Sequence, residues 1–249
     1  RDRPEKQRAA VIRVTMQTHL MYMHILSELK DAVADCGRGD GFDNVNNAYA
    51  WDEVAAYIIG SLEGEGVGGS DNFEDGQLLW SLGNKRSIEF SRQNEERYAV
   101  ANAAIENLLL SGKGQIRASN CNHLERTSHG IANLLIVSIV QSVVKYAIVN
   151  QFVSWDSPDE DIATGETYAT AVIPIIRAYD NDSAATIERN MVVANFEELV
   201  TDGPQAVADA FLAVADDINI QCEVIGKSFE VDACLNYEPT YKITSGTKD

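Results

Sequence analysis

Glu53 and Tyr57 are the residues of this sequence whose types and spacing point most directly to chemistry. They are four residues apart, so in a helix both side chains project from one face and can share a ligand. A carboxylate and a phenolate are hard oxygen donors, which suit a hard cation such as Fe(III). Asp52 lies about a quarter-turn away, as a third ligand or as a negative charge at the helix start. The alternative is that Glu53 and Tyr57 belong to a buried hydrogen-bond network without a metal.

A weak similarity between two segments of the sequence adds Glu166 to this group of candidate ligands. The segment 50–56 can be laid over the segment 163–169, which places Glu53 against Glu166. If the two segments are related, two helical bundles of similar build pack side by side and Glu166 becomes a further metal ligand. Chance similarity between alanine-rich helices explains the same pattern.

Two histidines of the N-terminal region offer nitrogen ligands. His24 and Glu28 are four residues apart, which is a legitimate spacing for a shared metal. His24 lies roughly opposite the apolar stripe of its helix, however, so we expect it to be solvated. His19 flanks that stripe and is either a core histidine or a metal ligand.

Lys85 and Arg86 form a basic pair at the end of an apolar run. Together they can neutralise a bound anion, because the guanidinium of Arg86 can bind two oxygens at once. The alternative is pairing with Glu89 or another acidic neighbour, which needs no ligand.

Motifs of the common catalytic sites do not occur. The sequence has no Gly-x-Ser-x-Gly, no P-loop and no His-Glu-x-x-His. The glycine-rich stretch 64–69 follows a predicted helix and lacks the Lys-Ser/Thr of a phosphate-binding loop. We therefore expect a protein that is not an enzyme.

Cys36, Cys121, Cys222 and Cys234 lie near predicted helix ends or in the tail, and none belongs to a Cys-x-x-Cys pair. This spacing argues against a structural zinc site and fits two disulfides formed in an oxidising compartment. Proximity favours Cys222–Cys234, which leaves Cys36–Cys121, and free buried thiols are the alternative. Asn181 begins an Asn-Asp-Ser glycosylation sequon, which also fits a secreted protein.

The chain has 249 residues and a formal net charge of −18, from 20 Lys and Arg against 38 Asp and Glu. Such a surface repels nucleic acid and anionic membranes and favours cations or basic partners. An acidic excess is also an ordinary aid to solubility. The most apolar stretch, 131–149, is interrupted by polar residues that would be costly in hydrocarbon, so it predicts a buried helix and no membrane span. These residues are Asn133, Ser138, Gln141, Ser142 and Lys145.

Apolar residues recur every three or four positions along most of the chain, and strand-like alternation is sparse, which predicts an all-α fold. One helix has its apolar stripe at Val11, Thr15, Thr18, Tyr22, Ile25, Leu29 and Val33. Further helices are expected at 48–62, 77–110 with an interruption near Ser91, 131–152, 166–179 with a kink at Pro174, 184–196 and 204–217. The 77–110 helix should end before Gly112. The helices build one domain over residues 8–240, or two packed sub-bundles at 8–115 and 125–240.

Five segments stand in a distinctive order along the chain. They are a Trp-Asp-Glu helix with a glycine-rich exit (51–64), an apolar run closing in Lys-Arg (78–86), a Lys-Tyr helix (143–147), a proline-kinked helix with the turn after it (171–191) and a tail around Cys222 and Cys234. Their order and spacing resemble the algal iron-assimilating and high-CO2-induced secreted proteins, with which the phytotransferrins are grouped. The likeness covers the chain from about residue 11 to residue 234.

The resemblance implies a periplasmic or cell-surface protein that binds Fe(III), with carbonate as a co-bound anion. It also implies the two-bundle architecture of imelysin-like iron-uptake proteins, here cross-linked by disulfides. The chain departs from these families because it lacks both the Glu-x-x-Glu of some members and the His-x-x-Glu of imelysins.

The sequence therefore predicts a secreted Fe(III)-binding protein that works with a cell-surface receptor or by self-assembly. Its expected metal ligands are Glu53, Tyr57, Asp52, Glu166 and His19, with Lys85 and Arg86 at an anion. The alternative is a non-catalytic structural or assembly protein of the cell surface that keeps the fold without a metal. Titration with Fe(III), with and without carbonate, distinguishes the two.

Overall fold

The computed structural model describes residues 3–36, 45–60, 78–95, 98–153, 160–192, 198–228 and 230–235. Helices form the regular structure of these ranges, in which the strand-like pairings are two isolated bridges, Gln93–Ala99 and Lys227–Asp232. The predicted all-α class is confirmed. In chain order the helices are α1 (Glu5–Thr15), η1 (Met16–Leu20), α2 (Met21–Cys36), α3 (Val45–Ile59), α4 (Leu79–Glu89), α5 (Val100–Arg117), α6 (Cys121–Asn150), α7 (Glu160–Arg177), α8 (Asn181–Met191), α9 (Pro204–Leu212) and α10 (Cys222–Ile225).

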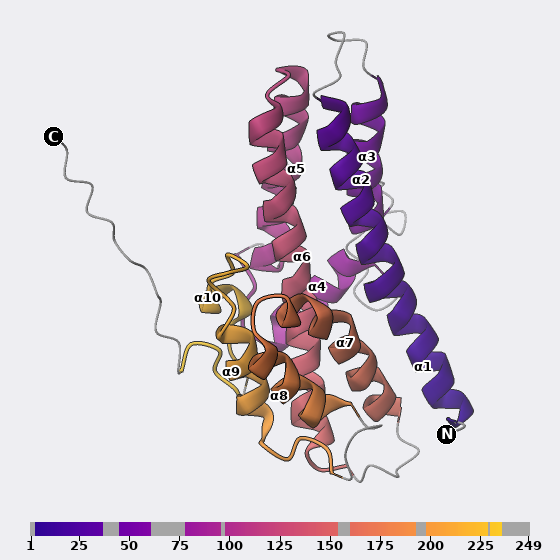
Figure 1. The fold of residues 1–249 in the computed structure, drawn as a ribbon, viewed down its shortest axis with the longest axis vertical. Helices are drawn as coiled ribbons and strands as arrows, with labels where there is room; N and C mark the ends of the chain where they lie inside the picture. Colours follow the sequence, from indigo (N-terminus) through magenta and orange to yellow (C-terminus); the bar gives the residue numbers. More distant parts are fainter. Residues whose placement is uncertain are drawn as a thin grey trace, which may run out of the picture.

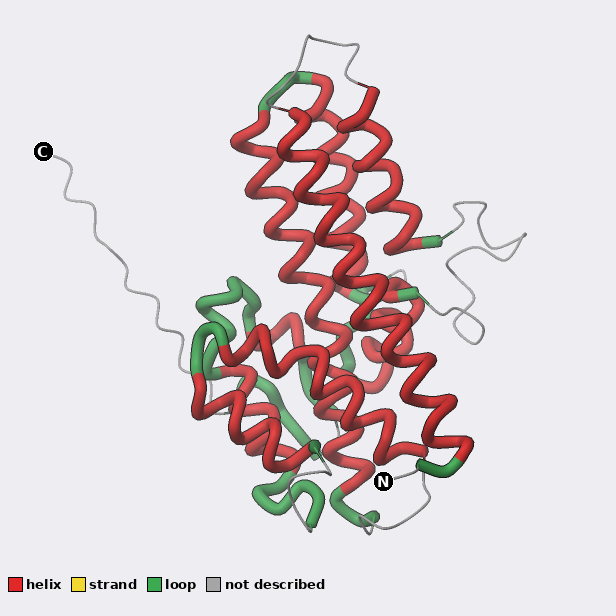
Figure 2. The backbone as a smooth tube through the Cα atoms, turned by 45° about the vertical axis from the view of Figure 1, so that its right-hand side comes forward, coloured by secondary structure: helices red, strands yellow, loops and turns green. Residues whose placement is uncertain are grey.

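The helices gather around α6, which runs through the length of the molecule (Figure 1). Its N-terminal half lies with α2, α3 and α5 in the upper part, and its C-terminal half lies with α7, α8 and α9 in the lower part (Figures 1 and 2). The N-terminal helix links the two parts, since α1 packs on α7 and α2 packs on α3. An imelysin-like symmetry between the two parts stays a prediction.

Helix α6 is the central helix that its sequence predicts, although it begins ten residues earlier than expected. It is 30 residues long and by length and composition apolar enough to cross a membrane, and 67% of its most apolar stretch is buried inside the protein. Burial of this kind is what the core helix of a bundle shows, because neighbouring helices cover its apolar surface on several sides.

The N-terminal helix is continuous from Glu5 to Cys36, with a π-helical turn, η1, in its middle. A π turn holds more residues than an α turn, so it changes the phase of the buried stripe. The predicted burial of the stripe residues Thr18, Tyr22, Ile25 and Leu29 is confirmed. Before the π turn, Ala10 and Val14 are buried instead of the predicted Val11 and Thr15. The prediction failed there because it assumed a uniform α-helical period.

The expected interruption near Ser91 is confirmed, because α4 and α5 are separate helices and Ser91 has φ of 54°. The expected end before Gly112 is wrong, since α5 continues to Arg117. Gly112 instead allows α5 to pack closely against α3. A Cβ at this position would lie 1.9 Å from Cζ2 of Trp51, so only glycine lets α5 approach the indole of α3 this closely.

In the second half of the chain the helices occur in the predicted order, but their first and last residues differ from those predicted. Helix α7 begins six residues before the expected start and contains Pro174. Asp180 caps α8, because its carboxylate accepts hydrogen bonds from the backbone N–H groups of Asp182 and Ser183. Asn181 is exposed in the first turn of this helix, and its glycosylation stays a prediction.

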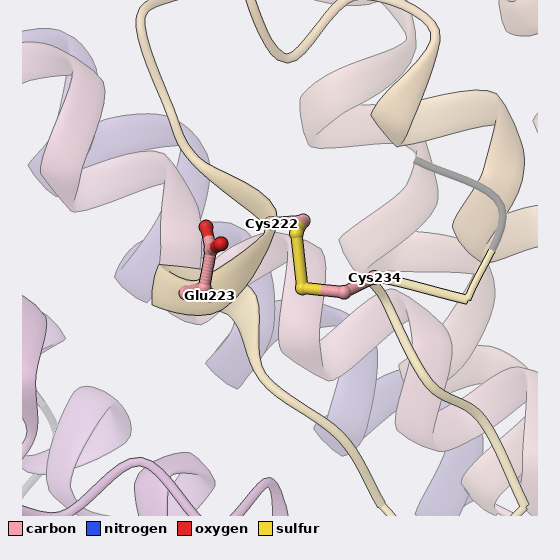
Figure 3. Close-up of side chains that lie close together, drawn as sticks. All are labelled: Cys222, Glu223 and Cys234. Carbon is pink, nitrogen blue, oxygen red and sulfur yellow. A yellow bond between two sulfur atoms is a disulfide. The ribbon is translucent and has the colours of Figure 1, made fainter. Parts of the chain in front are cut away.

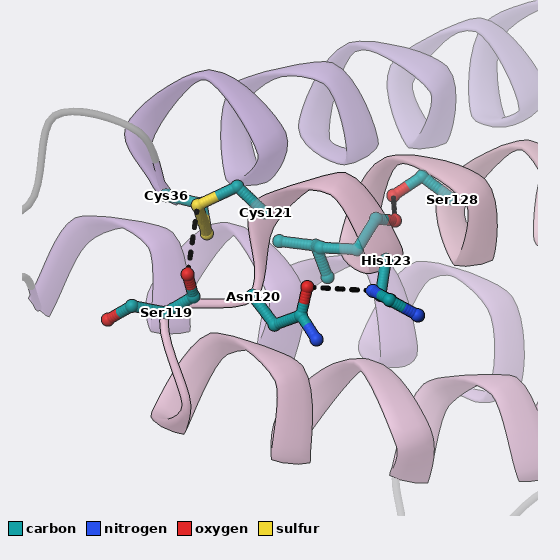
Figure 4. The surroundings of a disulfide bond; sticks show 7 residues. Cys36, Ser119, Asn120, Cys121, His123 and Ser128 are labelled. Carbon is teal, nitrogen blue, oxygen red and sulfur yellow. Dashed lines mark hydrogen bonds between the residues drawn. A yellow bond between two sulfur atoms is a disulfide. The ribbon is translucent and has the colours of Figure 1, made fainter.

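Both disulfides pair as the sequence predicts. Cys222, at the start of α10, is bonded to Cys234, with 5.2 Å between their Cα atoms (Figure 3). Cys36, at the end of α2, is bonded to Cys121, at the start of α6, with 5.6 Å between the Cα atoms (Figure 4). The second bond joins two helix ends that are 85 residues apart in the sequence, so it fixes the tip of the upper part of the molecule.

Candidate metal centre

Helices α2 and α3 pack along each other and position the candidate site. Helix α3 buries Trp51, Val54 and Ile58, which recur at helical spacing on one face. The indole Nε1–H of Trp51 donates to the carbonyl oxygen of Leu109 at 2.9 Å, which anchors α3 to α5. This packing fixes the rotation of α3 about its axis and leaves Glu53 at the surface beside α2.

Glu53 meets two residues of α2, His24 and Glu28. One ligand atom from each of these three side chains lies within 4.8 Å of the others. The Nδ1 atom of His24 is 3.8 Å from a carboxylate oxygen of Glu28. The ring of Tyr57, one turn after Glu53, contacts the ring of His24 edge to face, with 4.4 Å between the centroids. The predicted pair on α3 is thus joined by two residues from a second helix.

The group fits a metal ion in its chemistry. Two carboxylates and an imidazole can move onto one ion by small side-chain rotations, because their ligand atoms are already close. Carboxylate oxygens suit hard cations, and imidazole suits iron, zinc and copper. The half-buried Tyr57 lies next to His24 and offers a phenol oxygen to the same region.

The electrostatics of the site favour a cation. Burial raises the pKa of Glu28, and the negative charges of Glu53 and Asp31 raise it further, while His24 acts in the opposite direction. A raised carboxyl pKa means that the ionised form is destabilised where it stands. A metal ion between these side chains would remove that destabilisation.

An open, mostly polar hollow of about 410 Å³ adjoins the group, and its lining carries four carboxylates. Glu28, Asp31, Asp35 and Glu53 supply them, and Tyr49 and Ala50 complete the wall on α3. Like charges concentrated in a concave surface raise the local concentration of cations. The hollow therefore gives a cation a path from solvent to the side chains of Glu28 and Glu53.

The other predicted ligands lie elsewhere. Asp52 is exposed on α3 and is not one of the three grouped residues. Glu166, on α7, forms a part-buried ion pair with Arg3, which precedes α1. His19 lies in η1, where its Nδ1 is 3.1 Å from the hydroxyl oxygen of Thr18, and burial lowers its pKa. The structure thus brings Glu53 and Tyr57 together with His24 and Glu28, and not with Glu166 or His19.

The basic pair is split between surface and core. Lys85 is exposed, whereas Arg86 is buried and forms an ion pair with Glu89. The Nε–H of Arg86 also donates to the hydroxyl oxygen of Ser142 at 3.0 Å, and Lys145 donates to Glu89 at 2.6 Å. Pairing with Glu89, the alternative to an anion site, is therefore what the structure shows for Arg86.

Two tyrosines complete this inner polar network. The rings of Tyr146 and Tyr168 are stacked with 5.8 Å between centroids, and the guanidinium of Arg86 lies 5.9 Å from the ring of Tyr146. Burial raises the pKa of Tyr146 to about 12 and raises the pKa of Tyr168 as well. Both phenols therefore stay protonated at neutral pH, and the network joins α4, α6 and α7 as a structural element.

A second group of ligand types, Cys222, Glu223 and Cys234, is not available to a metal. Both sulfur atoms are consumed by the disulfide, and a metal binds the thiolate form of cysteine. In Figure 3 the carboxylate of Glu223 lies beside the disulfide, with an oxygen within 4.8 Å of both sulfur atoms.

Sequence reasoning underestimated His24. Its expected exposure is confirmed, because 44% of its side chain is accessible, but its ring also contacts Tyr57. The available signal was its spacing of four residues from Glu28, which is a metal-binding spacing. The position of α3 beside this face of α2 could not be read from either helix alone.

No family model, no curated protein and no solved structure matches this chain. The interpretation of the site consequently rests on the geometry of His24, Glu28, Glu53 and Tyr57. The resemblance of motif order to the algal iron-assimilating proteins stays a prediction.

Proposed function

We propose that the chain is a secreted or cell-surface protein that binds Fe(III) between α2 and α3. The observation that carries the proposal is the convergence of His24, Glu28 and Glu53, whose ligand atoms lie within 4.8 Å of one another. Tyr57 supports it, because a phenolate is a strong ligand for a hard cation and its ring lies against His24. Iron is here the cargo of the protein.

Other features support the same function. The acidic hollow beside the site attracts cations, and the net charge of −18 does so at longer range. Two disulfides are typical of proteins from oxidising compartments, which supports secretion. Two carboxylates and one imidazole leave coordination positions that carbonate can fill, so carbonate belongs to the proposal as a co-bound anion. A cell-surface receptor for the loaded protein remains a prediction of the sequence.

Titration of the purified chain with Fe(III), supplied as a weak chelate with and without carbonate, tests the proposal. We expect saturable binding, a visible tyrosinate-to-iron absorption band and a rise in melting temperature on loading. Glu53→Gln should weaken binding at least about tenfold, which corresponds to about 1.4 kcal/mol. Tyr57→Phe should remove the absorption band.

Glu106→Gln is the matched control, because Glu106 is an exposed carboxylate on α5 outside the site. It should bind iron as the parent does. Equal affinities of the parent, Glu53→Gln and Glu106→Gln would show that iron binds non-specifically to the acidic surface, and the proposal would then be wrong.

A further inference from the structure

Apolar side chains form an uncovered stripe on the outer face of the N-terminal helix. Ile12, Met16, Leu20 and Met23 expose 65%, 51%, 54% and 61% of their surface. Their spacing of four, four and three residues places them on one face over about three helical turns. We call these four residues the outer stripe.

The outer stripe lies at an open edge of the molecule. The N-terminal helix forms the right-hand edge in Figure 1, and in Figure 2, where that side comes forward, it runs in front of the other described helices. Contiguous exposed apolar surface is uncommon on monomers and marks sites of association. Two of the four residues are methionines, whose flexible side chains adapt well to a partner surface.

The charge of this helix differs from the charge of the whole chain. Residues 3–36 contain five basic side chains and four acidic ones, whereas the whole chain has 20 basic and 38 acidic residues. The basic residues are Arg3, Lys6, Arg8, Arg13 and Lys30, and the acidic residues are Glu5, Glu28, Asp31 and Asp35. Two copies that meet along this helix therefore avoid the repulsion that the rest of the surface would cause.

The charges are also ordered along the helix. Four of the five basic residues precede Met16, and three of the four acidic residues follow Met23. If two copies pack antiparallel about a point midway between Gln17 and Thr18, Ile12 of one copy lies opposite Met23 of the other, and the exposed Glu5 lies opposite the exposed Lys30. A parallel arrangement would instead place like charges together.

We propose that the outer stripe is the contact surface of a two-fold symmetric homodimer with antiparallel N-terminal helices. A two-fold contact uses the same surface on both copies, which a self-complementary stripe with opposite charges at its two ends provides. Long helices that pack at a shallow crossing angle of about 20° stay close over several turns. The dimer does not require a bound metal ion, so its test uses the metal-free protein.

Sedimentation equilibrium of the full chain in the presence of a chelator measures the dimer directly. We expect a concentration-dependent dimer, and we expect Leu20→Glu to raise its dissociation constant at least about tenfold. The reason is that both copies would place a carboxylate near the two-fold axis in a contact that excludes water. Leu110→Glu is the matched control, because Leu110 is 64% exposed on α5 and should leave the dimer unchanged.

A charge exchange tests the antiparallel arrangement. Lys30→Glu should weaken the dimer, because Lys30 faces Glu5 of the other copy, and adding Glu5→Lys should restore it. Circular dichroism and melting temperature establish that each variant is folded. A wild-type chain that is monomeric at all concentrations overturns the proposal. A monomer that binds lipid vesicles through the outer stripe overturns it in the same way. Equal effects of Leu20→Glu and Leu110→Glu, or failure of the charge exchange to restore the dimer, overturn it as well.

Discussion

Opposing influences act on the pKa of Glu28 at the candidate metal centre. Burial and two neighbouring carboxylates raise its pKa, and His24 offsets only part of this effect. Because folding raises this pKa, the folded chain binds more protons than the unfolded chain between the two pKa values. The contribution of Glu28 to stability is therefore present at low pH and is lost as the pH rises through the raised pKa.

The first prediction concerns the neutral replacement Glu28→Gln. At neutral pH it should raise the melting temperature of the metal-free protein, because it removes a destabilised negative charge, and this gain should disappear at low pH. The same variant should lose the rise in melting temperature that Fe(III) causes in the parent. Thermal unfolding with and without Fe(III), across a pH series, checks both effects. A lower melting temperature of metal-free Glu28→Gln at neutral pH would contradict this account of the site.

Glu89 illustrates the opposite case at the buried Arg86. Burial alone would raise the pKa of Glu89, but the charges and hydrogen bonds of Arg86 and Lys145 outweigh it and lower the pKa. The contribution of Glu89 to stability is therefore present at neutral pH and is lost as the pH falls through the lowered pKa.

We expect Glu89→Gln to destabilise the protein by about 1–3 kcal/mol. Removal of one partner leaves the guanidinium of Arg86 buried without its counter-charge, and the partial exposure of Glu89 reduces the effect below that of a fully buried pair. Urea unfolding at neutral pH measures the change. Lys85→Gln, at an exposed neighbouring position, should stay within about 0.5 kcal/mol of the parent. Similar values for the two variants would rule out a structural role for the ion pair.

At the level of the helices, the contact between α3 and α5 determines where Glu53 and Tyr57 point. This contact depends on Gly112, where a Cβ would overlap the indole of Trp51. Gly114 lies in the same helix, and a Cβ there would meet nothing within 4 Å. The two glycines therefore offer a matched comparison of the same substitution.

We expect Gly112→Ala to destabilise the protein by about 1–3 kcal/mol, because the added methyl group forces Trp51 or α5 to move. Gly114→Ala should instead stabilise it by up to about 1 kcal/mol through higher helix propensity. Gly112→Ala should also weaken iron binding, since Trp51 belongs to the helix that carries Glu53. Denaturant unfolding and iron titration of both variants provide the measurement. Equal stabilities would show that the contact is not tight in solution.

The helices themselves could be predicted because each depends on a local apolar period and on breakers such as Ser91 and its neighbours. Two features could not. The π-helical turn shifts the buried phase of α1, and no residue type in Met16–Leu20 announces such a turn. The pairing of Glu53 with His24 and Glu28 depends on which helix lies beside α3, which is a tertiary contact between separate amphipathic helices.

At the scale of the whole molecule, the two disulfides close loops of very different length. Cys36–Cys121 closes a sequence separation of 85 residues that includes α3, and it holds the end of α2 against α6. Cys222–Cys234 closes a separation of 12 residues in the C-terminal segment. In the chain-entropy account, the longer loop gives the larger stabilisation, about 4–5 kcal/mol against about 3 kcal/mol.

The double variant Cys36→Ser with Cys121→Ser should therefore lose more stability than Cys222→Ser with Cys234→Ser. It should also weaken iron binding, because α2 carries His24 and Glu28 and its far end would no longer be fixed to α6, whereas the C-terminal pair lies in a different part of the molecule. Iron affinity and unfolding free energy of both double variants give the comparison. If removal of Cys222–Cys234 weakened iron binding as much as removal of Cys36–Cys121, the coupling would run through overall stability and not through the position of α2.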